Sequence, residues 1–266
     1  MTDETVEGLS QSGDPRIPTL LLVDDNEEFR QYLDIELRDE YQILQASNGR
    51  EAYDMALANE VDIVVSDVMM PIMDGTELCR QLKGNVKTSH ILVVLLTAKV
   101  GEEHRLAGYK AGADYYVAKP FNIEILKNRI AHLCKMSLQR HDMFINDVDV
   151  TPQEMTTSKL DEEIYAKAVE LVNVNMANEE YSVEQFSSDM CMSRMTLYRK
   201  LQTITGQKPL EFIRTIRLKK AAMLLKTTEF TIVEIAEMVG YGTARNFSKN
   251  FKAFFGKSPS EYKNRE

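Results

Sequence analysis

The sequence lacks several features that would place it outside the cell or in a membrane. No apolar run among its 266 residues approaches the roughly 20 needed to cross a membrane. The first 18 residues are polar and acidic, without the apolar core of a secretion signal. Its three cysteines, Cys79, Cys134 and Cys191, are isolated and predict neither a disulfide framework nor a zinc site. We therefore expect a cytoplasmic protein with reduced thiols and no membrane contact.

Positive charge is scarce over most of the chain. Residues 1–140 carry 15 Lys and Arg against 23 Asp and Glu, and residues 141–190 carry 2 against 12. Residues 191–266 reverse this balance with 15 against 6, a net charge of +9 in a protein of overall net charge −9. Only the C-terminal part is therefore predicted to meet a polyanion.

Between residues 19 and 138 the pattern alternates between apolar runs and helical periodicity. Strands are predicted by the apolar runs at 19–23, 41–46, 61–65, 91–96 and 115–118. Helices are predicted at 26–38, 49–59, 74–83, 102–111 and 123–136. Five such units predict a doubly wound, five-stranded parallel (βα)5 sheet.

Polar side chains stand where four of the five strands end. Asp24 and Asp25 follow the first strand and Asp67 the third, while Thr97 and Lys119 end the fourth and fifth. A parallel sheet brings these ends to one edge, and three carboxylates in one pocket need a cation. Oxygen ligands favour Mg²⁺, and the arrangement suits phosphoryl transfer through an aspartyl phosphate. An Asp-Asp pair by itself would indicate no more than a turn and helix cap.

Residues 19–138 resemble the receiver domain of two-component response regulators. The resemblance is carried by LLLVDDN (20–26), SDVMMPIMDG (66–75), LLTAK (95–99) and GADYYVAKPF (112–121). It implies that Asp67 is phosphorylated by a histidine kinase. It also implies that Mg²⁺ binds directly to Asp25, Asp67 and the backbone carbonyl of Met69, and chiefly through water to Asp24.

The same resemblance assigns roles to the ends of the last two strands. It implies that Thr97 and Lys119 contact the phosphoryl group, that Tyr116 is the switch aromatic, and that the peptide bond before Pro120 is cis. No kinase module is visible, because none of the four histidines lies in a His-Glu-Leu-Arg-Thr-Pro-like setting. The kinase is expected as a separate protein or upstream in the same polypeptide.

A helix-capping pattern occurs twice in the C-terminal part. Ser182 and Thr231 each open a short helix through a capping box, and a second cap follows 11 and 12 residues later, respectively. A short helix, a tight turn and a longer helix form a helix-turn-helix. The helix that begins at Pro209 lies between the two copies and could pack on both.

Each longer helix has one apolar face and one face rich in hydrogen-bond donors. Donors on the first turns of a helix suit the reading of base edges in a major groove. A solvated basic face is the simpler interpretation of either helix alone, but two in tandem within the basic segment favour DNA. The predicted DNA-binding residues are Arg194, Met195, Thr196, Tyr198, Arg199, Ala244, Arg245, Asn246, Ser248 and Lys249.

Residues 160–266 resemble an AraC-type DNA-binding domain, most specifically in IAEMVGYGTARNFSKNFKAFFGKSPSEYKNR (235–265). The resemblance implies an all-α domain whose two recognition helices enter successive major grooves about 34 Å apart. Asn246 departs from the Tyr found in many members, which puts base preference in doubt. A receiver joined directly to such a domain also resembles the C-terminal part of hybrid two-component sensors.

The predicted organisation is a disordered or linker N-terminus at 1–18, a receiver at 19–138, a linker at 139–158 and a DNA-binding domain at 159–266. The predicted function is phosphorylation-dependent, sequence-specific transcription regulation, with homodimerisation when phosphorylated, and not an enzyme activity. A phosphatase of haloacid-dehalogenase type is an alternative, but it needs an acid where Met69 stands. An interaction scaffold that no longer binds DNA is a third possibility.

Overall fold

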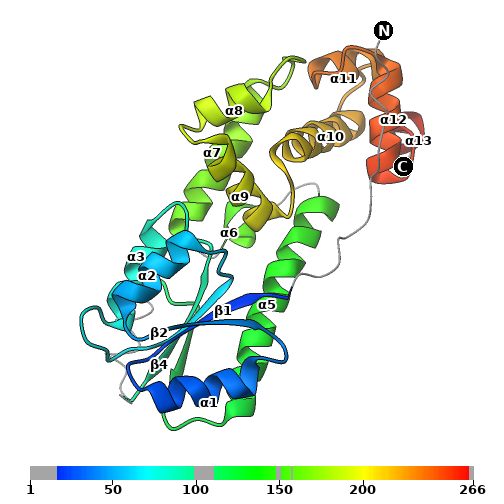
Figure 1. Cartoon of the computed structure of the whole chain (residues 1–266). Helices are drawn as coiled ribbons and strands as arrows, with labels where there is room; N and C mark the ends of the chain where they lie inside the picture. Colours follow the sequence, from blue (N-terminus) through cyan, green and yellow to red (C-terminus); the bar gives the residue numbers. More distant parts are fainter. Residues whose placement is uncertain (1–16, 99–110, 148–150, 157, 264–266) are drawn as a thin grey trace. The chain divides into compact units, whose positions relative to one another are not determined.

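The computed structural model describes residues 17–98, 111–147, 151–156 and 158–263. The chain divides into two compact units, one of residues 1–79 and 91–123 and one of residues 80–90 and 124–266. The first contains a β-sheet and the second is helical (Figure 1). The helix predicted at 102–111 and the predicted N-terminal segment fall almost entirely outside the described residues.

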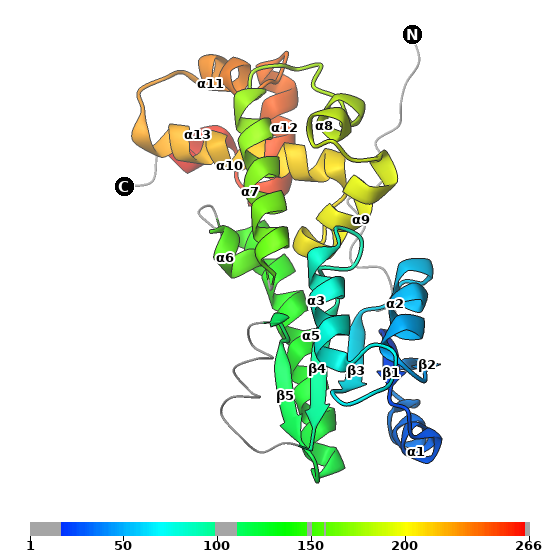
Figure 2. The same cartoon turned by 90° about the vertical axis from the view of Figure 1, so that its left-hand side faces the viewer.

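The first unit is built on a parallel sheet of five strands in the order β2-β1-β3-β4-β5. The strands are β1 (Thr19–Val23), β2 (Gln42–Ala46), β3 (Ile63–Asp67), β4 (Leu92–Thr97) and β5 (Tyr115–Ala118). They lie side by side in Figure 2, and every residue of β1, β3 and β4 is buried, as expected of strands covered on both faces. The predicted receiver-type α/β fold is confirmed.

Helices follow the first three strands of the sheet. They are α1 (Glu27–Leu37), α2 (Gly49–Ala58) and α3 (Gly75–Gly84). Asn26 and Asn48 cap the first two, because each side-chain oxygen accepts a backbone N–H of the opening turn. The chain of α3 passes from the first unit to the second between Cys79 and Arg80.

The second unit contains the two predicted helix-turn-helix motifs. Its helices are α5 (Ile123–Asn146), α6 (Pro152–Met155), α7 (Lys159–Val174), α8 (Val183–Asp189), α9 (Arg194–Thr205), α10 (Pro209–Thr227), α11 (Ile232–Met238), α12 (Ala244–Phe255) and α13 (Pro259–Lys263). Both predicted capping boxes are present, at the starts of α8 and α11. As Figures 1 and 2 show, α10 lies between α8–α9 and α11–α12. The motif boundaries predicted from caps are confirmed.

The helix predicted to end at Met136 is longer in the structure. α5 continues to Asn146, since no proline or glycine interrupts it. The fully buried Phe144 stacks on Phe212 with ring centroids 5.5 Å apart, and Met155 of α6 is also buried in this core. Part of the stretch predicted as a linker therefore belongs to the packed helical unit. The division into domains at 138 and 159 stays a prediction.

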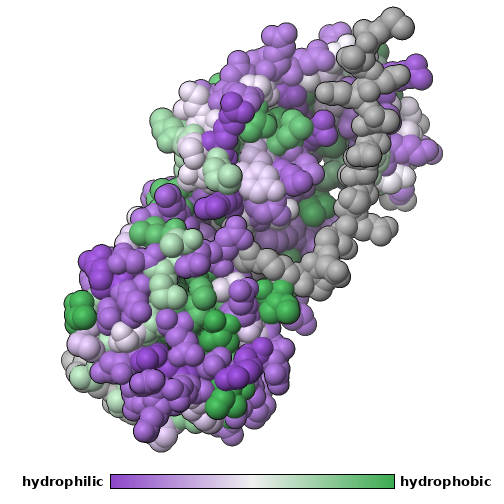
Figure 3. All heavy atoms as spheres, viewed as in Figure 1, coloured by the Kyte–Doolittle hydropathy of each residue, from purple (hydrophilic) through white to green (hydrophobic). Residues whose placement is uncertain are grey.

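In the part of the chain that the structure describes, no helix has the length and apolarity to cross a bilayer. On the face drawn in Figure 3, apolar side chains are interspersed with hydrophilic ones. Scattered apolar side chains of this kind are ordinary on protein surfaces.

The half-buried His90 predicts a pH-dependent stability. Burial lowers its pKa to about 3, with Lys200 and Lys83 acting in the same direction and Asp161 opposing them. Its Nδ1 is shielded from solvent and has no hydrogen-bond partner among the described residues. His90 is therefore neutral in the folded state but takes a proton in the unfolded state near pH 6.5. Stability should fall as the pH drops from 6.5 towards 3, by at most about 1.4 kcal/mol per pH unit.

The His90 effect can be measured by urea unfolding of the full chain between pH 7.5 and 5. In His90→Gln this contribution should disappear and the pH slope should flatten, while His141, whose pKa is also lowered by burial, remains in both proteins as a common background. Equal pH slopes in the wild type and the variant would contradict the assignment.

Candidate functional site

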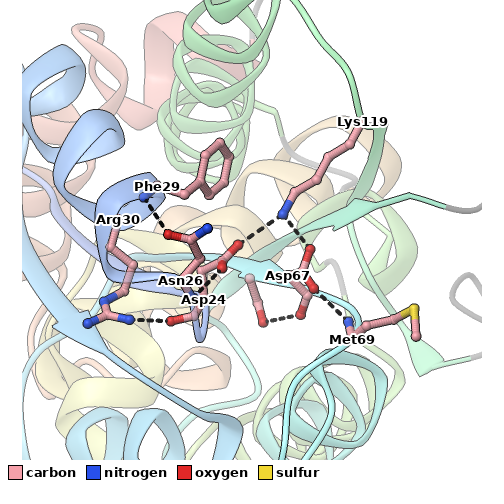
Figure 4. Close-up of polar contacts among 8 residues, drawn as sticks. Asp24, Asn26, Phe29, Arg30, Asp67, Met69 and Lys119 are labelled. Atoms are coloured by element: carbon pink, nitrogen blue, oxygen red, sulfur yellow. Dashed lines mark hydrogen bonds and ion pairs between the residues drawn. The ribbon is translucent and has the colours of Figure 1, made fainter.

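The predicted acceptor residues meet at one edge of the sheet. Asp24 follows β1, Asp67 is the last residue of β3, and Lys119 follows β5. The Lys119 Nζ lies 2.5 Å from Oδ1 of Asp67 and 2.9 Å from Oδ2 of Asp24 (Figure 4). One ammonium group thus joins two carboxylates from different strands, as the positions at the strand ends predicted.

The charges in this site depend on one another because they are shielded from water. Asp24 and Asp67 are buried, being 4% and 8% exposed. Burial by itself would lower the pKa of Lys119, but its hydrogen bonds and ion pairs with Asp67 and Asp24 outweigh that effect and raise the pKa. The Lys119 ammonium also lies 4.4 Å from the centre of the Phe29 ring, a cation–π distance. Lys119 therefore stays charged beside the carboxylates at neutral pH.

Residues that the sequence did not single out hold the Asp24 carboxylate. The side-chain Oδ1 of Asp24 accepts a hydrogen bond from the backbone N–H of Asn26 at 2.9 Å. The backbone carbonyl of Asp24 accepts a hydrogen bond from the Arg30 guanidinium at 2.6 Å. The Phe29 ring packs edge to face on Phe121, with centroids 6.2 Å apart. Nothing in the local pattern distinguished these residues from an ordinary first turn of a helix.

The backbone around Asp67 is also restrained. The Met69 N–H donates to Oδ2 of Asp67 at 2.8 Å, and the Ser66 hydroxyl donates to the Asp67 carbonyl at 2.8 Å. Gly75 packs against the same carbonyl so closely that an added Cβ would lie 2.1 Å from that oxygen. Only glycine fits this position, and the Asp-Gly pair in the sequence is its signal.

The other predicted residues of the pocket occupy its surroundings. Thr97 is buried at the end of β4, and its carbonyl accepts the Lys119 N–H at 2.7 Å. Tyr116 lies half-buried in β5, and Asp25 is exposed beside Asp24. The peptide bond between Lys119 and Pro120 is cis, which confirms that expectation. The roles of Thr97 and Tyr116 as phosphoryl contact and switch stay predictions.

Mg²⁺ fits this site because of the oxygen atoms that the site offers as ligands. Among the residues that the structure describes, no group of three or more His, Cys, Asp and Glu side chains is arranged to hold a metal ion. Lys119 instead lies between the carboxylates of Asp24 and Asp67. These carboxylates, the neighbouring Asp25 and the backbone carbonyl of Met69 are nevertheless the hard oxygen donors that Mg²⁺ prefers. The donor set fits the ion.

The second candidate site is formed by the donor-rich faces of α9 and α12. Leu197 and Leu201 in α9, and Phe247 and Phe251 in α12, are fully buried, which confirms the predicted core faces. The predicted DNA-binding residues that are exposed are Arg194, Met195, Tyr198, Arg199, Arg245, Asn246 and Lys249. The partly exposed ones are Thr196, Ala244 and Ser248.

Side-chain contacts restrain some of these residues. Arg194 forms an ion pair with Glu184 of α8 at 2.6 Å, which joins the two helices of the first motif. The Asn246 side chain accepts from Asn250 at 2.8 Å. The remaining exposed side chains lie on the surface of α9 and α12. DNA contact by any one of them stays a prediction.

Comparison with known proteins agrees with this arrangement. Residues 20–131 match the family described as response regulator receiver domain, and residues 186–265 match a helix-turn-helix domain family. The transcriptional regulatory protein SrrA of Staphylococcus aureus is 30% identical over 169 residues, which cover 62% of this chain and 67% of SrrA. The chain belongs to the response regulator family. Residues 186–265 form an AraC-type helix-turn-helix region.

Two further proteins resemble this response regulator over different lengths. Histidine kinase P4 of Formosa agariphila is 41% identical over 247 residues, which cover 93% of this chain but only 18% of that protein. The chain therefore spans less than a fifth of that relative. The chemotaxis response regulator CheY4 of Vibrio cholerae is 31% identical and covers 44% of this chain and 98% of its own, with a TM-score of 0.42.

Proposed function

We propose that this response regulator is a cytoplasmic, phosphorylation-controlled, sequence-specific regulator of transcription. The observation that carries the proposal is the Asp24–Lys119–Asp67 arrangement on the same chain as two helix-turn-helix motifs. The first part provides a nucleophile with a fixed counter-charge, and the second provides two helices for DNA. We call α9 and α12 the reading helices.

The proposed reaction is the transfer of a phosphoryl group from a phosphohistidine to Asp67. A carboxylate oxygen of Asp67 attacks phosphorus, an O–P bond forms, and the N–P bond breaks as the histidine imidazole leaves. Lys119 offsets the negative charge on the moving group. The Met69 N–H, now bonded to one Asp67 oxygen, orients the carboxylate so that its other oxygen faces Lys119.

Mg²⁺ would be held by Asp24, Asp25, Asp67 and the backbone carbonyl of Met69. When bound, the ion supplies positive charge that offsets the three carboxylates and the phosphoryl oxygens. Met69 stands two residues after the acceptor, and its side chain is 58% exposed. It cannot supply the acid that a phosphatase of haloacid-dehalogenase type needs there, so the site suits a switch and not a hydrolase.

The proposed output is DNA binding by a phosphorylated homodimer. Each chain offers two reading helices with exposed cationic and amide side chains, and the segment 191–266 carries the net positive charge. Dimerisation would bring two such pairs to a repeated site and so increase affinity through effective concentration. The kinase is proposed as a separate protein or an upstream part of the same polypeptide, in line with the relative that is named a histidine kinase.

The proposed function is tested by genome-wide footprinting of the full chain with and without a small phosphoryl donor such as acetyl phosphate. We expect protected sites with repeated half-sites, occupied at lower protein concentration when the donor and Mg²⁺ are present. Binding should weaken steeply with salt, because several phosphate contacts release counterions. No protection in either state would overturn the DNA part of the proposal, and donor-independent protection would overturn the control part.

Two substitutions distinguish specific contacts with bases from the nonspecific attraction of a basic surface to DNA. Arg199→Ala in α9 and Arg245→Ala in α12 remove exposed guanidinium groups from the two reading helices. If each contacts a base, each variant should lose about 1–3 kcal/mol of binding free energy at its own half of the site. Lys252→Ala, an exposed lysine near the end of α12, is the matched control and should change binding only slightly. Equal losses in all three variants would indicate a non-specific basic face.

A further inference from the structure

A buried polar cluster in the second unit shares no residue with the Asp24–Lys119–Asp67 site or with the exposed faces of the reading helices. Ser89 is fully buried, and the side chains of Asp161 and Lys200 are each 2% exposed. The Lys200 Nζ donates to Oδ1 of Asp161 at 2.7 Å and to Oγ of Ser89 at 2.6 Å. The Ser89 hydroxyl donates to the same Asp161 oxygen at 2.8 Å. The two buried charges thus pair with each other, and Ser89 forms a hydrogen bond with both of them.

Ser89 belongs to a short turn, residues 85–90, that follows α3. Its backbone N–H donates to the carbonyl of Asn85 at 2.8 Å, and the buried Thr88 hydroxyl donates to the carbonyl of Leu82 at 2.8 Å. Val86 packs against the core of the helical unit. We call residues 85–90 the Ser89 turn. It forms hydrogen bonds to the end of α3 through Thr88, and to α7 and α9 through Ser89.

Lys200 connects this turn to the first reading helix. Its neighbours Tyr198 and Arg199 are exposed, whereas Lys200 is buried on the opposite side of α9. The C-terminal end of α9 has a second hold, because a ring nitrogen of His141 lies 2.8 Å from the carbonyl of Thr203. The residues that form these two contacts with α9, Ser89 and His141, precede the region matched by the helix-turn-helix family.

The other end of α3 begins at the acceptor strand. The Gly75 N–H donates to the carbonyl of Val68 at 3.0 Å, and Gly75 packs directly against the carbonyl of Asp67. α3 then runs without a break to Gly84, just before the Ser89 turn. A helix moves as a stiff element, so a displacement of its first turn is carried to its last.

We propose that the Ser89 turn holds the first reading helix in place through Asp161 and Lys200, and that α3 couples the phosphorylation state of Asp67 to this helix. The coupling part rests on the function proposed above. The first motif is then the regulated one, since Lys200 belongs to its reading helix α9. This route through α3 is separate from the homodimerisation proposed to follow phosphorylation.

The test uses Ser89→Ala in the full chain, which removes one hydroxyl and leaves Asp161 and Lys200 paired. Hydrogen exchange resolved by mass spectrometry should show α9 amides exchanging about tenfold faster, the effect of losing a hydrogen bond to charged groups, with α12 amides unchanged. The donor-dependent gain in DNA affinity should fall by a similar factor. Ser188→Ala, an exposed serine of α8, is the matched control and should alter neither.

Unchanged exchange in α9 would overturn the docking role of the Ser89 turn. Faster exchange in α9 with an undiminished response to the phosphoryl donor would overturn the coupling. If the wild-type protein bound no DNA in either state, the proposed function would fail, and the exchange of α9 would still decide the docking role independently.

Discussion

Asp67→Asn is expected to abolish phosphorylation and, with it, every donor-dependent change in DNA binding. An amide oxygen at this position cannot act as the carboxylate nucleophile, yet it can still accept from Lys119 and Met69, so the fold should persist. If the phosphorylated dimer gains from two linked sites, the wild type should bind repeated DNA about 10²-fold more tightly after phosphorylation. The variant should stay at the unphosphorylated level. Intact-mass spectrometry and DNA titrations with and without donor measure both effects.

Asp39→Asn is the matched control for this experiment, because Asp39 is an exposed aspartate of the first unit just beyond α1. It should be phosphorylated and should respond to the donor like the wild type. A phosphoryl adduct on the Asp67→Asn protein would place the acceptor elsewhere. A donor response without an adduct would show that the donor acts on DNA binding by another route.

Lys200→Met should strongly destabilise the helical unit. It removes the ammonium and leaves the Asp161 carboxylate buried, with Ser89 as its remaining hydrogen-bond donor in the cluster. Removing one partner of a buried ion pair costs about 3–5 kcal/mol. Hydrogen exchange of α7 and α9 under increasing urea measures this loss, and it resolves the two compact units separately.

The double variant Asp161→Asn with Lys200→Met separates charge from packing. Once both charges are gone, no uncompensated carboxylate remains, and the asparagine oxygen can still accept from Ser89. The double variant should therefore recover most of the stability that Lys200→Met loses. Lys249 is an exposed lysine of the other reading helix, α12. The free energy of unfolding of Lys249→Met should stay within about 0.5 kcal/mol of the wild-type value. No recovery in the double variant would show that packing of the lysine stem, and not its charge, holds this site.

Local patterns predicted the features that depend on neighbouring residues. The capping boxes at Ser182 and Thr231 and the second caps 11 and 12 residues after them are confirmed, since a cap is formed within one turn of backbone. The meeting of Asp24, Asp67 and Lys119 was also predictable. Parallel strands place their carboxyl ends at one edge of the sheet, whatever the conformation of the loops between them.

Other features could not be predicted because distant parts of the chain decide them. α5 had no sequence signal for its end, and the extra ten residues are stabilised by Phe144 in a core that includes Phe212. Lysine is usually a surface residue, so Lys200 in a basic helix gave no sign of being buried. Its partners Ser89 and Asp161 stand 111 and 39 residues away.

By itself the sequence determined the receiver fold, the edge at which Asp24, Asp67 and Lys119 meet, and the two helix-turn-helix motifs, because periodicity, caps and strand ends are local properties. Tertiary structure alone decided that a second cation is buried. Lys200 turns away from the reading face towards Ser89 and Asp161. The physical reason is that burial makes a charge costly unless a partner is within hydrogen-bonding distance, and only the packed fold determines which partners come that close.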